Sequence, residues 1–168
     1  MSCVIGRRGG MLNLNHTDLT IRAEKWLVNS LGCNFAFRDL GSVGSEIPDA
    51  IGWRDGWISH LVECKTSRSD FLADKKKWFR RNPDMGMGMY RYMMCPKDMI
   101  KPEEVPEGWG LLYILPKIIR KVKKAEVQTN NHKSEMTLLV SALRRVHIRG
   151  DLAKIYSMDT LKTEVAHA

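Results

Sequence analysis

The sequence predicts an α/β domain in which helices flank a central mixed β-sheet. The chain has 168 residues, 43% of them hydrophobic, which suffices for one domain with its own buried core. Hydrophobic patterning gives the order helix, three strands, helix, strand, followed by two further strands and a helix. Because a helix joins the third and fourth strands, a crossover connection within a mixed sheet is expected.

The first half of the chain is expected to form one helix and three strands. Residues 1–14 hold three glycines and show no periodicity, which predicts a loose arm. The first helix is expected to begin near Asn15 or Thr17, both suitable N-caps, and to end at Leu31-Gly32. Arg54-Asp55-Gly56 is a hairpin signal between two strands. The three strands are predicted over residues 33–40, 47–53 and 57–65.

The second half is expected to hold two helices and three strands. Ser69 is the predicted N-cap of a helix over residues 70–81, which Phe71 and Trp78 anchor to the sheet. The strands are predicted over residues 90–95, 109–115 and 118–127. A last helix over residues 134–149 is predicted from the helical spacing of Met136, Leu139, Val140 and Leu143. The predicted organisation is an arm over 1–14, one domain over 15–150 and a C-terminal tail over 151–168.

Charge and cysteine content narrow the range of partners. Lysine and arginine number 27 against 19 acidic residues, and this net charge of +8 suits a polyanion such as nucleic acid. A merely soluble basic protein is the alternative. The four cysteines form no Cys-x-x-Cys pair, which argues against zinc and favours buried, reduced thiols in a cytoplasmic protein. No apolar run is long enough for a signal peptide or a membrane span, so no membrane partner is expected.

Two carboxylates and a lysine are the candidate catalytic group. Asp49 precedes Glu63 by thirteen intervening residues, and Lys65 follows two positions later. Side chains alternate along a strand, so Glu63 and Lys65 share one face while Cys64 points to the other. Around the predicted hairpin, positions whose numbers sum to about 110 or 112 lie opposite each other, which brings Asp49 beside Glu63. All three groups are expected to converge at one end of the sheet.

This grouping favours a metal site for phosphodiester hydrolysis. Asp49 and Glu63 offer the oxygen ligands that Mg²⁺ prefers, Mn²⁺ can substitute, and the backbone carbonyl of Cys64 adds a further ligand. Lys65 would orient or deprotonate the attacking water, or sit near the scissile phosphate. The spacing by itself equally fits an ordinary cluster of charged side chains on a half-exposed sheet.

Glu24 is a candidate fourth member on the first helix. It follows Ile21 by three positions and precedes Leu27 by three, so it does not lie on a plainly polar face. A buried carboxylate without a partner would be costly. Glu24 therefore either lies at the helix rim, pairs with a cation, or serves as a metal ligand or a positioner of metal-bound water.

Basic residues after the Glu-x-Lys triplet are the candidate DNA-binding surface. With Phe71 and Trp78 directed to the sheet, they are expected to face outward beside the site, where a phosphate backbone would pass. A solvated helix face is the alternative for any one of them. The candidates are Arg68, Lys75, Lys76, Lys77, Arg80 and Arg81.

These residues resemble a known nuclease group. Ile47-Pro48-Asp49-Ala50-Ile51-Gly52, followed by Val62-Glu63-Cys64-Lys65-Thr66-Ser67-Arg68-Ser69-Asp70-Phe71, is similar to the PD-(D/E)xK nuclease superfamily, and within it to the MmcB-like DNA repair family. The resemblance covers roughly residues 15–125. It implies a restriction-endonuclease-like fold with an αβββαβ core, in which Asp49, Glu63 and Lys65 match the catalytic positions and Glu24 is a looser match.

The resemblance implies a Mg²⁺-dependent DNA endonuclease acting in repair, recombination or a phage-type process. A non-catalytic DNA-binding module on the same fold and an RNA nuclease are the alternatives, because one fold serves many functions. A homodimer is a further expectation, since cleavage of both strands of a duplex needs two sites.

Overall fold

A single six-stranded mixed sheet organises the part of the chain that the structure describes. The computed structural model describes residues 14–42 and 46–156, so most of the predicted arm and tail lie outside the described residues. The strands are β1 (Phe35–Arg38), β2 (Ala50–Arg54), β3 (Ile58–Cys64), β4 (Tyr90–Pro96), β5 (Gly110–Ile114) and β6 (Ile119–Lys123). The helices are α1 (His16–Asn29), α2 (Arg68–Asp74), α3 (Trp78–Arg81) and α4 (His132–Ile148), with short 3₁₀ helices η1 (Pro83–Met85) and η2 (Leu152–Tyr156).

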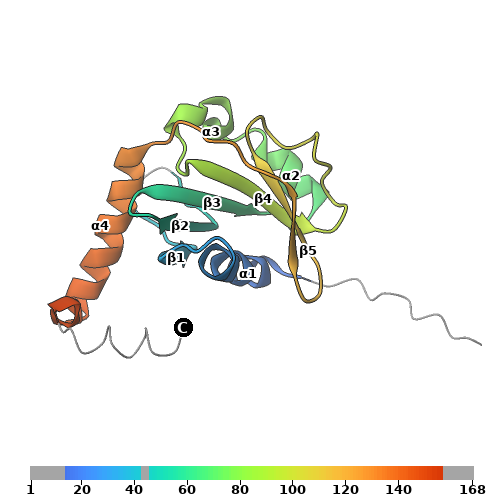
Figure 1. Ribbon diagram of the computed structural model, residues 1–168. Coiled ribbons are helices and arrows are strands. Elements are labelled where there is room, and N and C mark those ends of the chain that lie inside the picture. Colours follow the sequence, from blue (N-terminus) through green and yellow to red (C-terminus); the bar gives the residue numbers. More distant parts are fainter. Residues whose placement is uncertain (1–13, 43–45, 157–168) are drawn as a thin grey trace, which may run out of the picture.

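The strands lie in the sheet in the order in which they occur in the chain, from β1 to β6. The β3–β4 and β4–β5 pairs are parallel, and the other three pairs are antiparallel. The α2–α3 segment makes the crossover from β3 to β4 and lies over one face of the sheet, while α1 lies against the other (Figure 1). The α/β class, the mixed sheet and the flanking helices are thereby confirmed.

Helix α1 begins where its sequence provides a capping box. The side chain of Asn15 accepts a hydrogen bond from the backbone N–H of Asp18, and the carboxylate of Asp18 accepts one from the backbone N–H of Asn15. Leu19, Ala23 and Leu27 recur on one side of the helix and are fully buried. They pack with inward-facing residues of the sheet: Ala50, Val62, Cys64, Tyr92 and Met94.

The β2–β3 hairpin sets the register on which the candidate site depends. Asp55 and Gly56 adopt positive φ angles of 51° and 80°, the conformation for which an Asp-Gly turn is suited. Ala50 pairs with Val62 and Arg54 with Ile58, so the numbers of paired residues sum to 112 as predicted. Strand β4 also forms as expected, whereas β6 ends at Lys123, short of the predicted residue 127.

The predicted helix over residues 70–81 is wrong in three respects. Ser67, rather than Ser69, caps α2 by accepting a hydrogen bond from the backbone N–H of Asp70. The helix stops at Asp74, and Lys77 is extended at φ −61° and ψ 142° before the single turn of α3. Phe71 is fully buried as predicted, but Trp78 is 53% exposed and does not anchor the helix.

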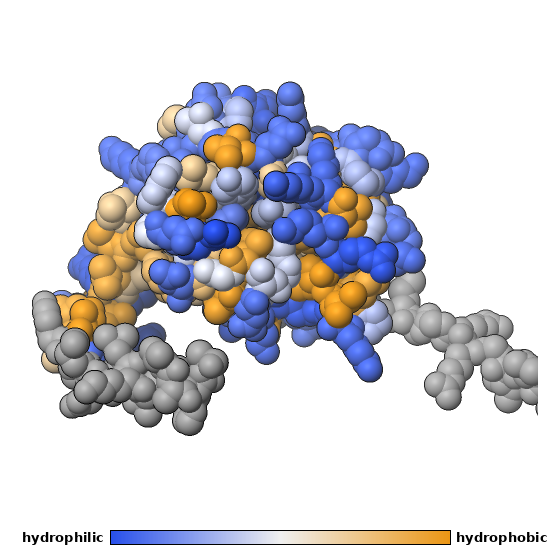
Figure 2. Space-filling view, viewed as in Figure 1, coloured by the Kyte–Doolittle hydropathy of each residue, from blue (hydrophilic) through white to orange (hydrophobic). Residues whose placement is uncertain are grey.

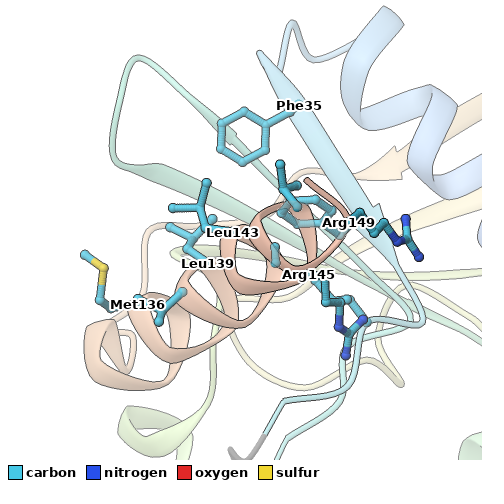
Figure 3. Close-up of a pocket in the computed structure, with 11 residues that line it drawn as sticks. Phe35, Met136, Leu139, Leu143, Arg145 and Arg149 are labelled. Carbon is cyan, nitrogen blue, oxygen red and sulfur yellow. The ribbon is translucent and has the colours of Figure 1, made fainter. Parts of the chain in front are cut away.

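Helix α4 buries residues of its first two turns and leaves an apolar side uncovered by the described residues. Leu138 is buried in the core on the α2 side of the sheet. Met136, Val140 and Leu143, whose spacing predicted this helix, are each more than half exposed. With Phe35 of β1 they line a groove whose far end carries Arg145 and Arg149 (Figure 3). The space-filling view shows the apolar colour gathered over α4 (Figure 2).

Two smaller expectations concern the thiols and the membrane. Cys33, Cys64 and Cys95 are free and buried, as predicted, and Cys3 lies outside the described residues. Across residues 14–42 and 46–156, none of the helices has the length and apolar character needed to cross a bilayer.

Candidate active site

Glu63 and Lys65 meet at the C-terminal end of β3, as strand alternation predicts. The Lys65 Nζ atom lies 3.3 Å from the Glu63 Oε2 atom, and both side chains are almost fully buried. Cys64, between them, packs in the core on the α1 side of the sheet. The register that pairs Ala50 with Val62 places Asp49, the residue before β2, next to this pair.

Asp49 is held by contacts from both sides. Its Oδ2 atom accepts a hydrogen bond of 2.7 Å from the backbone N–H of Cys64, and its Oδ1 atom lies 3.3 Å from the Nε2 atom of His16. Burial and the neighbouring Glu63 carboxylate raise the pKa of Asp49 to about 6. The side chain keeps 18% of its surface exposed, so Asp49 is not closed off from solvent.

Lys65 is a buried ammonium held between two carboxylates. Its Nζ atom lies 3.0 Å from the Oδ1 atom of Asp74, in addition to its contact with Glu63. Burial by itself would lower the pKa of Lys65, but the charges of Glu63 and Asp74 outweigh it and raise the pKa above its ordinary value. The two neighbouring carboxylates therefore favour the charged form of Lys65.

Asp74 lies in the same cluster, although no sequence motif points to it. It is 1% exposed, and the Nε atom of Arg80 donates to its Oδ2 atom at 2.6 Å. Burial opposes ionisation, but the hydrogen bond and charge of Arg80 prevail and lower the pKa of Asp74 to about 2. A usable signal was present: Asp74 is three positions after the buried Phe71, so both lie on the same side of α2.

Arg80 joins the carboxylates into one cluster. Its guanidinium lies 3.2 Å from the Oε2 atom of Glu63 and 3.7 Å from the Oε1 atom of Glu46, and it stacks 4.4 Å from the ring centre of Trp109. The side chain is only 6% exposed. The expectation that Arg80 faces outward toward a phosphate backbone is therefore wrong, because the break between α2 and α3 turns it into the site.

The other predicted DNA-binding residues occupy three kinds of position. Lys77 is half exposed, and its Nζ atom contacts Asp74 at 3.0 Å and Glu63 at 3.5 Å. Arg68 forms a bidentate pair with Glu104 at 2.7 Å. Lys75, Lys76 and Arg81 are exposed, with Lys75 also lying over the Phe71 ring. An outward basic surface thus remains, although it is smaller than predicted.

Glu24 lies at the rim of α1, where it pairs with a cation. The Nε atom of Arg38 donates to its Oε2 atom at 3.0 Å, and about a third of the side chain is exposed. This is one of the arrangements that the sequence left open. From the same helix it is His16, which no motif indicated, that contacts Asp49. A metal-binding role for Glu24 remains a prediction.

The donor set fits a magnesium ion better than a zinc ion. Within residues 14–42 and 46–156, no three His, Cys, Asp or Glu side chains are grouped as a metal site. Mg²⁺ needs fewer protein ligands, because it keeps several waters and binds through one or two carboxylates and the phosphates of its substrate. Asp49 and Glu63 are the two carboxylates predicted to bind it, with the Cys64 carbonyl between Glu63 and Lys65 in the chain. Glu63 is paired with Lys65, Lys77 and Arg80, so a magnesium site here remains a prediction.

Comparisons with known proteins give a fold relative without a known activity. No protein-family model matches the chain, and a search of curated proteins gives no match either. A solved structure, the SPO1766 protein of unknown function from Silicibacter pomeroyi, superposes with a TM-score of 0.59 at 19% sequence identity. The match covers 88% of this chain and 99% of that one. Similarity at this level of identity shows a common fold alone.

Proposed function

We propose that this protein is a metal-dependent nuclease that hydrolyses phosphodiester bonds in DNA. The observation that carries the proposal is the contact of 3.3 Å between Glu63 and Lys65, with Asp49 immediately before the adjoining strand β2. Two carboxylates and an ammonium at one sheet end form a set that metal-assisted phosphodiester hydrolysis can use. The order α1, β1, β2, β3, α2, β4 also supports a restriction-endonuclease-like core.

Asp49 and Glu63 would hold Mg²⁺, or Mn²⁺ in its place, and the ion would supply a polarised phosphate and a hydroxide nucleophile. Lys65 contributes positive charge at its Nζ atom. In this position Lys65 would orient or deprotonate the attacking water, or stabilise negative charge on the phosphate. Asp74 and Arg80 position Lys65 and Glu63 through their direct contacts.

The net charge and the exposed lysines support a nucleic-acid substrate. The chain carries a net charge of +8, and Lys75, Lys76 and Arg81 are exposed on the segment that covers the site. Cations in this position attract a phosphate backbone without reading sequence. Binding to DNA is accordingly expected to weaken as salt concentration rises.

A cleavage assay on several forms of DNA tests the proposal. Purified protein is incubated with closed-circular, linear, nicked, branched and single-stranded DNA in the presence of Mg²⁺, Mn²⁺ or excess EDTA. We expect cleavage with either ion, none in EDTA, and loss of cleavage in Asp49→Asn and Lys65→Ala. Asp98→Asn and Lys133→Ala change exposed residues and serve as matched controls.

Two results would overturn the proposal. Cleavage that persists in EDTA contradicts the metal mechanism. Salt-sensitive DNA binding without cleavage of any substrate form supports a binding module, and an RNA panel tested in parallel identifies an RNA nuclease.

A further inference from the structure

A recess lies immediately beside Glu63 on the side covered by α3. Its volume is about 340 Å³. Its walls combine carboxylates, cations and apolar side chains, a mixture suited to a ligand with both a charged and an aromatic part. The lining residues are Glu46, Ile47, Glu63, Lys77, Trp78, Phe79 and Arg80.

Trp78 is the distinctive member of this lining. It is 53% exposed, and Phe71 already supplies the contact that fixes α2 to the sheet. The Trp78 ring packs edge-on against Phe79, with ring centres 5.3 Å apart and planes at 85°. An edge-on neighbour supports the indole while leaving much of it open to solvent. Exposed aromatic rings beside cations are the platforms on which unpaired bases stack.

Lys77, the residue before Trp78, lines the same recess and carries a positive charge. Its Nζ atom lies 3.5 Å from Glu63, and half of the side chain is exposed. A base stacked on Trp78 would therefore have its own phosphate near the Lys77 ammonium and close to Glu63. A base inside a duplex cannot stack in this way, because both of its faces are covered by neighbouring bases.

We infer that Trp78 and Lys77 bind an unpaired nucleotide of a DNA strand next to Glu63, so that single-stranded or frayed DNA is the preferred substrate. The inference rests on the proposed function for the meaning of the neighbouring site. It specifies the substrate class, which the carboxylates and Lys65 leave open. Trp78 positions the strand and takes no part in bond cleavage.

Binding without metal tests this inference separately from catalysis. Fluorescence anisotropy is measured in EDTA with a labelled single-stranded DNA, the blunt duplex of the same sequence, and the matching RNA. We expect the wild type to bind the single strand more tightly than the duplex. Trp78→Ala should weaken single-strand binding about tenfold and leave duplex binding unchanged, and Trp78→Phe should retain most of the affinity.

Trp57→Ala is the matched control. Trp57 is a similarly exposed tryptophan, at 61%, in the β2–β3 hairpin at the opposite end of β3 from Glu63. This variant should bind single-stranded DNA like the wild type. Because Trp78 is exposed, Trp78→Ala should also melt like the wild type, which excludes unfolding as the cause of weaker binding.

Three outcomes would overturn the inference: tighter binding of the duplex, an equal loss on both DNA forms in Trp78→Ala, or tighter binding of RNA. The two proposals also fail separately. Trp78-dependent single-strand binding by a protein that cleaves nothing removes the nuclease proposal alone, whereas cleavage that is indifferent to Trp78 removes the substrate inference alone.

Discussion

Two buried glutamates on the α2 side of the sheet show how differently the same side chain is used. Glu135, in the first turn of α4, accepts from the Ser59 hydroxyl at 2.8 Å, the Asn130 amide at 2.7 Å and the Gly88 backbone N–H at 2.8 Å. Glu63 instead contacts three cations, from Lys65, Lys77 and Arg80. Both side chains are less than 5% exposed, so burial does not distinguish them.

Glu135 and Glu63 differ in whether another group can replace their hydrogen-bond or ion-pair partners. The neutral donors around Glu135 belong to β3 and to the segments that precede β4 and α4, and a lost partner leaves a buried carboxylate unsatisfied. The cations around Glu63 sit on long side chains, and Lys77 reaches solvent. A metal ion or a phosphate backbone can take part in that second network. Glu135 is therefore interpreted as a structural anchor and Glu63 as a site residue.

The largest expected effect is a loss of DNA cleavage when Glu63, but not Glu135, is replaced. Glu63→Gln should lower DNA cleavage by about 10³-fold or more, because the amide is a poor ligand and leaves cations unpaired. Cleavage rates and melting temperature, measured on the same preparation, check this. Glu126→Gln, at an exposed position, is the control. Cleavage by Glu63→Gln at the wild-type rate would remove Glu63 from the site.

The next effect separates the glutamates by stability. Glu135→Ala should reduce the free energy of unfolding by about 3 kcal/mol, because Ser59, Asn130 and the Gly88 N–H lose a buried acceptor. Urea unfolding measures the change, with Glu126→Ala as the exposed control. The variant should still cleave DNA per folded molecule. A wild-type unfolding midpoint would contradict the anchoring role.

Arg80→Ala tests whether the cations around Glu63 are exchangeable. We expect the free energy of unfolding to fall by about 2 kcal/mol, less than in Glu135→Ala. The loss is smaller because Lys65 and Lys77 still neutralise part of the charge of Glu63 and Asp74. Added Mg²⁺ should recover part of that loss by binding the freed carboxylates, and thermal unfolding with and without Mg²⁺ measures it. Arg81→Ala is the matched exposed change. If the ion pairs around Glu63 were purely structural, Mg²⁺ would not restore the stability of Arg80→Ala.

The smallest effect is a pH dependence from Asp49. Its pKa in the folded protein is raised from 3.8 to about 6, so the folded state holds a proton that the unfolded state has released between these values. Stability should therefore fall as pH rises from 4 to 6, by no more than about 2 kcal/mol. Urea unfolding across this range measures the slope, and Asp49→Asn should lack this component. If the wild type and Asp49→Asn showed the same dependence of stability on pH, the raised pKa would not belong to Asp49.

Local rules predicted the strands and the central pair of the site. A strand has a period of two residues, so Glu63 and Lys65 had to share a face. The Asp55-Gly56 turn fixed the register, and the register brought Asp49 to them. The same kind of local rule failed for residues 70–81, where one helical pattern covers a chain that breaks after Asp74.

The sequence by itself determined the class of fold, the hairpin register and the meeting of Asp49, Glu63 and Lys65, because these follow from periodicity and turn chemistry over short distances. Only the tertiary structure decided that Arg80 turns inward to Asp74 and that Trp78 stays exposed. It also decided that Glu24 pairs with Arg38 while His16 contacts Asp49. Such outcomes depend on which charges can be neutralised among segments far apart in the chain, and no local pattern carries that information.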